Sequence, residues 1–299
     1  MQHSEYLSRA LDCPIGRFLW GERTYVMGIL NVTPDSFSGD GVMDVQGAVA
    51  TGKRLVEEGA HILDVGGQST RPAYAAKIES TFSGSMAGPQ EISVNEELNR
   101  IIPVIEVLAG EVDVPISVDT YKPDVARRAL DAGATIINDV WGLKADPELA
   151  TVASEYKVPL VLMHNQRHTK YKDLITEIRA SLEASIELAL CAGVSQERIV
   201  LDPGFGFGKT PLHNLKVLRC LQELKALKYP LLIGTSRKST LGVMLHLPVG
   251  ERIEGTAATV AIAIANGADI IRVHDVKEMA RVARMTDAIV RVGDITGEK

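Results

Sequence analysis

The stretch IVLDPGFGFGK, residues 199–209, places a short apolar run directly before an aspartate, a proline and three glycines. The proline ends a strand ladder and the glycines favour a turn, so the pattern predicts a strand that carries Asp202 to the start of a loop. The glycine spacing matches neither the dinucleotide-binding pattern nor a P-loop. Asp202 is therefore the first candidate functional residue, and its role has to be inferred from the rest of the chain.

Composition limits the classes of protein to consider. The chain has 299 residues, 45% of them hydrophobic and 23% charged, which suits one α/β barrel or two smaller domains. A net charge of −6 provides no basic field for nucleic acid. The longest apolar stretch, 257–265, is too short to cross a membrane, and residues 1–20 lack the apolar core of a signal peptide. With three cysteines in no metal-type spacing, we expect reduced thiols and a cytoplasmic protein. The acidic net charge favours a small-molecule partner.

Hydrophobic spacing alternates between strand and helix along the chain. Strands are predicted at 25–31, 61–67, 115–120, 134–140, 159–165, 199–204, 231–236 and 269–275. Helices are predicted at 45–59, 94–108, 123–132, 147–156, 174–192, 212–227, 254–266 and 277–292. Eight such units without a linker predict a single (β/α)₈ TIM barrel. We assign it to residues 25–293, after an N-terminal extension (1–24) with a β-prone piece at 17–24 and before a tail (294–299).

Active sites of such barrels lie at the carboxyl ends of the strands, where alternate side chains point inward. Counting back by two from each strand end gives polar residues where a structural barrel layer would carry Val, Ile and Leu. The predicted inward residues are Asn31, Asp64, Asp119, Asn138, Asn165, Asp202, Arg272 and His274. Any one could be a satisfied core polar group, but together they indicate a polar ligand or tightly paired networks.

Two loops add candidate binding groups. Arg237, Lys238 and Ser239 follow the seventh strand and could begin a helix, a suitable place to hold an anion or polarise a heteroaryl oxygen, although a solvated basic pair is the alternative. The loop after the first strand is rich in oxygen donors between Asn31 and Asp40, which suits Mg²⁺ shared with substrate phosphates. Ordinary turns with side-chain hydrogen bonds would also explain that composition.

These residues carry a specific resemblance to the dihydropteroate synthases. The segment MGILNVTPDSFS (27–38) resembles the first signature of that family, and others follow in the same order. They are LDVGGQSTRP (63–72), SVDT (117–120), IIND (136–139), LMH (162–164), DPGFGFGK (202–209), SRKS (236–239) and IRVHDV (271–276). The match runs from about residue 25 to residue 277.

The resemblance implies that 6-hydroxymethyl-7,8-dihydropterin diphosphate condenses with 4-aminobenzoate, giving 7,8-dihydropteroate and diphosphate for folate synthesis. Asp119, Asn138 and Asp202 would bind the pterin nitrogens, and Lys238 would face the pterin oxygen. The residues implied on the aminobenzoate side are Thr70, Arg71 and Ser239.

The same resemblance implies that Arg272 and His274 hold the diphosphate and act in catalysis with Lys238, while Asn31 helps to place Mg²⁺. Neutralising the leaving group favours a dissociative displacement without a covalent nucleophile. The family also suggests a homodimer built through barrel helices.

Three departures from the family pattern qualify these roles. Ser38-Gly-Asp-Gly replaces the usual Ser-Asp-Gly-Gly, which leaves the role of Asp40 open, and Gln68 stands where glutamate is common. Residues 73–92 form a far longer loop than expected. It is either a tolerated surface insertion or a selectivity device, in which Phe82 excludes bulkier sulfonamides as in the drug-insensitive branch of the family.

Two other functions remain open from the sequence. A pterin-binding methyltransferase domain shares a similar barrel, but a methyl carrier has no diphosphate and no use for the first loop or for Arg272 and His274 as an anion clamp. A catalytically silent pterin-binding protein is the second, and intact Asn31, Lys238, Arg272 and His274 argue against it.

Overall fold

The computed structural model describes residues 6–8, 10–33, 44–69 and 91–291. Within them, eight parallel strands form one sheet in the order β8-β7-β6-β5-β4-β3-β10-β9. They are β3 (Tyr25–Asn31), β4 (Ile62–Gly66), β5 (Ile116–Asp119), β6 (Ile136–Asp139), β7 (Leu160–Met163), β8 (Ile199–Asp202), β9 (Leu232–Ile233) and β10 (Ile270–Val273). A parallel bridge between Leu201 and Leu231 joins the two edge strands and closes the barrel. The predicted (β/α)₈ barrel is confirmed.

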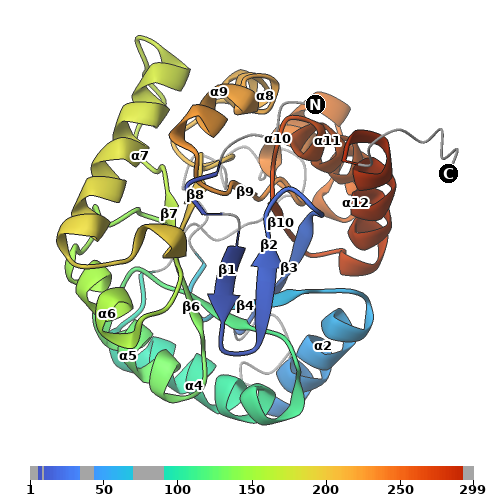
Figure 1. The fold of residues 1–299 in the computed structure, drawn as a ribbon. Coiled ribbons are helices and arrows are strands. Elements are labelled where there is room, and N and C mark those ends of the chain that lie inside the picture. Colours follow the sequence, from blue (N-terminus) through green and yellow to red (C-terminus); the bar gives the residue numbers. More distant parts are fainter. Residues whose placement is uncertain (1–5, 9, 34–43, 70–90, 292–299) are drawn as a thin grey trace, which may run out of the picture.

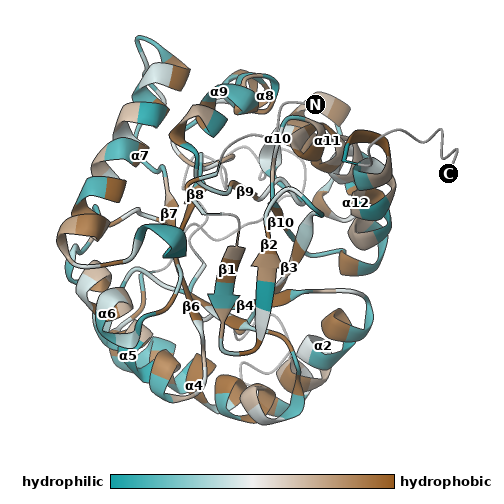
Figure 2. Cartoon of the chain, viewed as in Figure 1, coloured by the Kyte–Doolittle hydropathy of each residue, from teal (hydrophilic) through white to brown (hydrophobic). Residues whose placement is uncertain are grey.

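The helices surround the barrel, as Figure 1 shows in an end-on view. They are α2 (Val45–Glu57), α4 (Val94–Glu111), α5 (Pro123–Asp131), α6 (Glu148–Tyr156), α7 (Leu174–Cys191), α8 (Pro211–Arg219), α9 (Leu221–Leu224), α10 (Ser239–Leu245), α11 (Ile253–Ala265) and α12 (Val276–Val290). Side chains cap the amino ends of several helices. The Ser93 side chain accepts a hydrogen bond from the N–H of Glu96, and the Asp173 side chain accepts one from the N–H of Thr176. Hydrophilic and hydrophobic residues alternate along the outer helices (Figure 2), as expected for helices that pack one face on the sheet.

One predicted helix, 212–227, is interrupted. It divides at Cys220 into α8 and α9 and ends in a short 3₁₀ turn, Lys225–Leu227. Near the break, the Leu218 carbonyl accepts a hydrogen bond from Asn266 Nδ2 at 2.7 Å. A side-chain amide thus bonds to a carbonyl that a continuous helix would pair with its own backbone N–H. The strand predicted at 231–236 is reduced to β9, and α10 follows it from Ser239.

The inward face of the barrel has two layers. Toward the amino ends of the strands the layer is apolar and comprises Met27, Ile62, Ile136, Val161, Val200, Leu232 and Ile270. Two residues further along, on the same face, come the polar side chains of Asp64, Asn138, Asp202 and Arg272. The barrel is therefore a packed core below and a polar mouth above.

A hairpin covers the amino end of the barrel. Strands β1 (Ala10–Cys13) and β2 (Gly16–Leu19) pair antiparallel and lie across the barrel end in Figure 1. The Phe18 ring meets that of Tyr25 edge-on at 4.7 Å between centroids, and Trp20 is also buried in this cluster. The sequence predicted only a single β-prone piece at 17–24 and missed β1. Helices long and apolar enough to cross a membrane are absent from the described residues.

Candidate active site at the carboxyl ends of the strands

A buried network of charges crosses the mouth of the barrel. From β10, Arg272 donates through Nε to Asp64 Oδ2 at 2.5 Å and through Nη2 to Asp119 Oδ2 at 2.7 Å. From β6, Asn138 Nδ2 donates to the same Asp64 oxygen at 3.1 Å. The structure thus brings together four residues that are far apart in the sequence and that the alternation of side chains along the strands predicted to point inward.

Asp119 retains unused hydrogen-bonding capacity. Its Oδ1 is buried and has no partner within the described part of the chain, and the same holds for the hydroxyl of Ser117 on the same strand. Burial raises the pKa of Asp119 to about 7, against the opposing effect of the Arg272 guanidinium. Burial also works against charge on Arg272, but Asp64 and Asp119 outweigh it and raise the pKa of the guanidinium. A buried acceptor without a donor indicates a place where a ligand N–H can bind.

The glycine-rich turn after β8 holds Asp202 at the mouth. The N–H of Gly204 donates to Asp202 Oδ1 at 2.7 Å, and burial raises the pKa of this carboxyl while the nearby Lys238 opposes the rise. Gly204 has φ +72, and a Cβ there would lie 1.9 Å from the carbonyl oxygen of His164. A Cβ at Gly206 would lie 2.6 Å from Cδ of Lys238. Glycine is therefore required for the turn to approach its two neighbours.

Lys238 reaches over this turn from the start of α10. Its Nζ donates to the carbonyl of Phe205 and lies 4.6 Å from the centre of the Phe207 ring. Burial lowers the pKa of Lys238 to about 7, although the Asp202 carboxylate favours the charged form. The amine is therefore placed to give up or share a proton near neutral pH.

A second lysine lies below the same turn and was given no role from the sequence. Lys209 is fully buried and its Nζ contacts His164 Nδ1 at 2.8 Å and the carbonyls of Gly204 and Phe207 at 3.0 Å each. Burial lowers the pKa of Lys209 well below its ordinary value and that of His164 to about 2. The only sequence signal was its place at the end of the glycine-rich stretch.

His274 and Ser239 lie on neighbouring elements at the mouth. His274 Nδ1 is 3.1 Å from the hydroxyl of Ser236, which also accepts from the His274 N–H at 3.2 Å. Ser239 is buried and is the first residue of α10, directly after Lys238. Arg237 turns the other way and pairs with Asp275 through Nε at 3.0 Å. Of the predicted basic pair, Lys238 alone is directed toward Asp202.

Two predicted inward amides differ from the rest. Asn165 Nδ2 donates to the carbonyl of Val140 at 3.0 Å, and the Asn165 carbonyl accepts from Lys144, so this residue supports the loop after β6. Asn31 is exposed at the end of β3. Residues 34–43 of the loop that follows, including Asp40, lie outside the described residues. The described residues contain no group of three or more His, Cys, Asp or Glu that could hold a metal by themselves.

The stems of the long loop after β4 are joined by one lysine. Lys122 Nζ donates to Gln68 Oε1 at 2.8 Å, to the Ile92 carbonyl at 2.7 Å and to Glu97 Oε2 at 2.7 Å. Gln68 also donates to the hydroxyl of Tyr121 at 3.1 Å, so the amide supplies both an acceptor and a donor. Thr70, Arg71 and Phe82 lie outside the described residues, as does most of the predicted 73–92 loop.

Sequence reasoning also missed a buried carboxylate beside the mouth. Asp139, the last residue of β6, accepts from the N–H groups of Trp141 at 2.8 Å and Leu143 at 2.6 Å. Burial raises its pKa to about 6 in spite of these bonds. Asp139 therefore fixes the turn after β6. It follows Asn138 directly, and residue type alone does not show which of two adjacent polar residues serves the site and which supports the loop.

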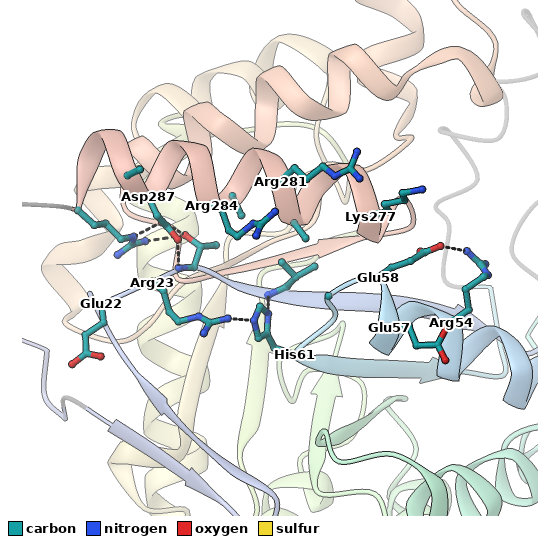
Figure 3. A pocket seen from close by; sticks show the side chains of 17 residues that line it. Glu22, Arg23, Arg54, Glu57, Glu58, His61, Lys277, Arg281, Arg284 and Asp287 are labelled. Atoms are coloured by element: carbon teal, nitrogen blue, oxygen red, sulfur yellow. Dashed lines mark hydrogen bonds and ion pairs between the residues drawn. The ribbon is translucent and has the colours of Figure 1, made fainter. Parts of the chain in front are cut away.

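Away from the residues of the polar mouth, a hollow of about 920 Å³ is lined mainly by α2 and α12. Figure 3 shows it between α2 and α12, with Lys277, Arg281 and Arg284 on one side and Arg23 and His61 on the other. Val26 and Thr24, at the amino end of β3, line it as well. It is therefore separate from the polar mouth, where the strands end.

Comparisons with known proteins show the family of this chain. The family model described as pterin binding enzyme matches residues 27–274. The dihydropteroate synthase of Clostridium beijerinckii is 50% identical over 91% of this chain and 96% of its own length, and that of Bacillus subtilis is 46% identical over 98% of both.

Solved structures give the same result. The dihydropteroate synthase of Clostridium difficile, in the presence of pteroic acid, aligns with a TM-score of 0.84 and 49% identity over 91% of this chain and 99% of that one. The Xanthomonas albilineans enzyme with 4-aminobenzoic acid aligns with a TM-score of 0.86 and 40% identity, over 96% and 100%. This chain therefore belongs to the pterin-binding enzyme family and, within it, to the dihydropteroate synthases.

Proposed function

We propose that this chain condenses 6-hydroxymethyl-7,8-dihydropterin diphosphate with 4-aminobenzoate, with the polar barrel mouth as the reaction site. The observation that carries the proposal is the buried Asp119, whose Oδ1 lacks a donor within the described residues. A pterin ring offers several N–H donors in one plane, which buried carboxylate and amide oxygens are suited to accept.

The pterin occupies the space between β5, β6 and β8. Asp119, Asn138 and Asp202 accept from its amino and ring nitrogens, and Lys238 donates to its oxygen. The lowered pKa of Lys238 and the raised pKa of Asp202 both follow from burial, and a ligand that bonds to both groups recovers part of that cost.

Arg272 and His274 hold the diphosphate. They share one face of β10 and its continuation. Arg272 donates through Nε and Nη2 to carboxylates of the described residues, and Nη1 is proposed to donate to a phosphate oxygen. Binding the leaving group with fixed donors stabilises the charge that develops as its bond breaks.

The residues present also suit Mg²⁺. Asn31 presents a hard amide oxygen at an exposed strand end, and Mg²⁺ is commonly bound by one or two protein oxygens together with substrate phosphates. Bound beside Asn31, it would neutralise part of the diphosphate charge. The remaining ligands would come from the loop after β3, where the role of Asp40 stays a prediction.

The 4-aminobenzoate binds next to the pterin methylene. Ser239 at the start of α10 borders this side, and Thr70 and Arg71 are proposed from the sequence to complete it. The C–O bond to the diphosphate breaks, the electron pair leaves with it, and the dihydropterin ring stabilises the cationic methylene. The aminobenzoate nitrogen then bonds to the methylene and loses a proton to solvent, so the protein mainly orients the two reactants.

A diphosphate-release assay tests this function. Purified protein with both substrates and Mg²⁺ should release diphosphate and form dihydropteroate in equal amounts. Pterin binding without any release of diphosphate would instead support a silent pterin-binding protein, and release that requires no aminobenzoate would indicate cleavage of the pterin diphosphate without condensation. Methyl transfer from methyltetrahydrofolate would support the methyltransferase alternative, for which no described residue offers specific support.

We further infer a homodimer and a cytoplasmic location. Large apolar side chains are exposed on the outer helices α11 and α12, with Ile262 51%, Met285 63% and Ile289 63% exposed. Grouped apolar side chains on one face favour burial against a second copy. The three cysteines are free thiols, which fits a reducing compartment.

A further inference from the structure

The segment that carries Lys238 rests on a buried arginine from a different element. Arg252, immediately before α11, is 0% exposed. Its guanidinium donates through Nη1 to the carbonyls of Arg237 at 3.1 Å and Lys238 at 3.4 Å, and through Nε to the carbonyl of Leu247 at 3.0 Å. One planar group therefore joins the backbone on both sides of α10.

The backbone at this point adopts a conformation that needs support. Arg237 has φ +56, in the left-handed region that side chains other than glycine rarely adopt. Its N–H donates to the hydroxyl of Thr256 at 3.3 Å, and that hydroxyl donates to the carbonyl of Arg252 at 2.9 Å. Arg252 and the first turn of α11 thus hold both the carbonyl and the N–H of Arg237, which directs the chain into Lys238.

We propose that Arg252 is a positioning residue for the condensation, because it fixes the backbone from which Lys238 reaches the pterin site. This inference rests on the proposed function. The Lys238 amine contacts the Phe205 carbonyl and the Phe207 ring, so a shift of its backbone moves the amine away from Asp202 and the glycine-rich turn. A lysine shifted in this way would lose the buried surroundings on which its present chemistry depends.

Gly242 allows this position to be disturbed without removing the arginine. A Cβ at Gly242 would lie 2.2 Å from Nη2 of Arg252 and 2.5 Å from its Cζ, so alanine there must displace the guanidinium. Gly250, only a short distance before Arg252 in the chain, has open space around its Cβ position. Gly242→Ala and Gly250→Ala are therefore a matched test and control, and Arg252→Lys, which keeps the charge but not the planar fork, is the second test.

Steady-state kinetics of these variants should separate positioning from support of the fold. For Gly242→Ala and Arg252→Lys we expect kcat/KM for the pterin diphosphate to fall about 100-fold while the folded fraction, followed by circular dichroism, stays unchanged at the assay temperature. In both variants the inflection of the pH-rate profile assigned to the pKa of Lys238 should move upward from about 7. The control, Gly250→Ala, should match the parent in rate and in pH profile. In a Lys238→Met background, adding Gly242→Ala should lower kcat/KM for the pterin diphosphate little further.

The pKa of Lys238 gives a measurement that does not depend on turnover. The pH dependence of its modification by an amine reagent, read by mass spectrometry, should shift upward in both variants. An unchanged Lys238 pKa would overturn the inference. So would an equal loss of kcat/KM from Gly242→Ala in the parent and in the Lys238→Met background. A parent protein that releases no diphosphate would contradict the proposed function instead, while the Lys238 titration would still decide the position of the lysine.

Discussion

Arg272 and Asp119 are ion-paired across the barrel mouth at 2.7 Å, although they lie 153 positions apart in the chain. The family resemblance implies that Arg272 holds the diphosphate and that Asp119 binds the pterin, and the structure links the two groups directly. Asp64, buried beside them, takes the second contact of the guanidinium at 2.5 Å. In the proposed site, the charge assigned to the leaving group thus also orients the proposed acceptor for the ring, and we expect substitutions at Arg272 to affect both.

The substitution Asp202→Asn should weaken pterin binding. The introduced amide keeps the shape and one acceptor oxygen of the carboxylate but replaces the other oxygen by a donor, which leaves a buried pterin N–H without a partner. We expect a loss of about 1–3 kcal/mol in calorimetry with the pterin diphosphate. Asn138→Ala should have a similar effect. Asp113→Asn, at an exposed carboxylate, is the control, and unchanged affinity in both site variants would remove β6 and β8 from the pterin site.

The unfolding free energy should depend on pH through Asp119. Its pKa is raised from 3.8 to about 7, so the folded state binds more protons than the unfolded state between these values. The contribution is fully present below the unfolded pKa and is lost as pH rises through the folded one. Relative to Asp119→Asn, the parent should therefore lose roughly 2–3 kcal/mol of unfolding free energy between pH 5 and pH 8 in urea unfolding. A constant difference across this range would show that Asp119 titrates normally.

His274 is a cleaner test of diphosphate binding than Arg272. Removing Arg272 takes the cationic partner away from the buried Asp64 and Asp119, so stability and pterin binding should both decrease. His274→Ala leaves that network intact and should lower kcat about 10²–10³-fold and weaken diphosphate binding, with bare pterin affinity nearly unchanged. His168→Ala, at an exposed histidine, is the control. An equal loss for bare pterin would place His274 in the ring pocket.

The sequence predicted the inward face of the strands because a strand has a strict period of two. Counting back from Asp202 or His274 therefore selected the correct side chains without knowledge of their neighbours. Asn165 was selected by the same rule, but its amide serves the Val140 carbonyl, because the rule gives direction and not partners.

Supporting residues were not predictable in the same way. Lys209 and Arg252 act through backbone carbonyls of loops, and any lysine or arginine near a turn would look the same in the sequence. The hairpin strand β1 was missed because its four residues include one large apolar side chain, Leu11, whose burial depends on the barrel end that it covers. Contacts between distant segments decide these positions.

Dimerisation should depend on the apolar surface of α12. Met285→Glu combined with Ile289→Asp places two charges where apolar side chains are 63% exposed each, and a charge buried at an interface without a partner is costly. We expect the variant to elute as a monomer in size-exclusion chromatography with light scattering. Leu212→Asp, at an apolar residue 70% exposed on α8, should leave the parent's oligomeric state unchanged. A parent that is monomeric at micromolar concentration would contradict the inference.

Sulfonamide response should depend on the loop of residues 73–92. Lys122 joins its two stems, at Gln68 and Ile92, so the loop leaves and re-enters beside the barrel mouth. Sulfonamides resemble 4-aminobenzoate but are bulkier at the acid end, and an aromatic side chain at the rim of the pocket can exclude the larger group. We therefore predict that Phe82→Gly, or deletion of residues 79–88, lowers the sulfonamide inhibition constant about tenfold or more.

The Michaelis constant for aminobenzoate measures whether that effect is selective. It should change far less than the inhibition constant, because the smaller carboxylate already fits. Tyr74→Gly, at another aromatic of the same loop, is a matched control for loss of an aromatic side chain. Equal changes in both constants would indicate that the loop supports the pocket without discriminating between ligands. A parent enzyme inhibited at ordinary sulfonamide concentrations would show that the loop is a tolerated insertion.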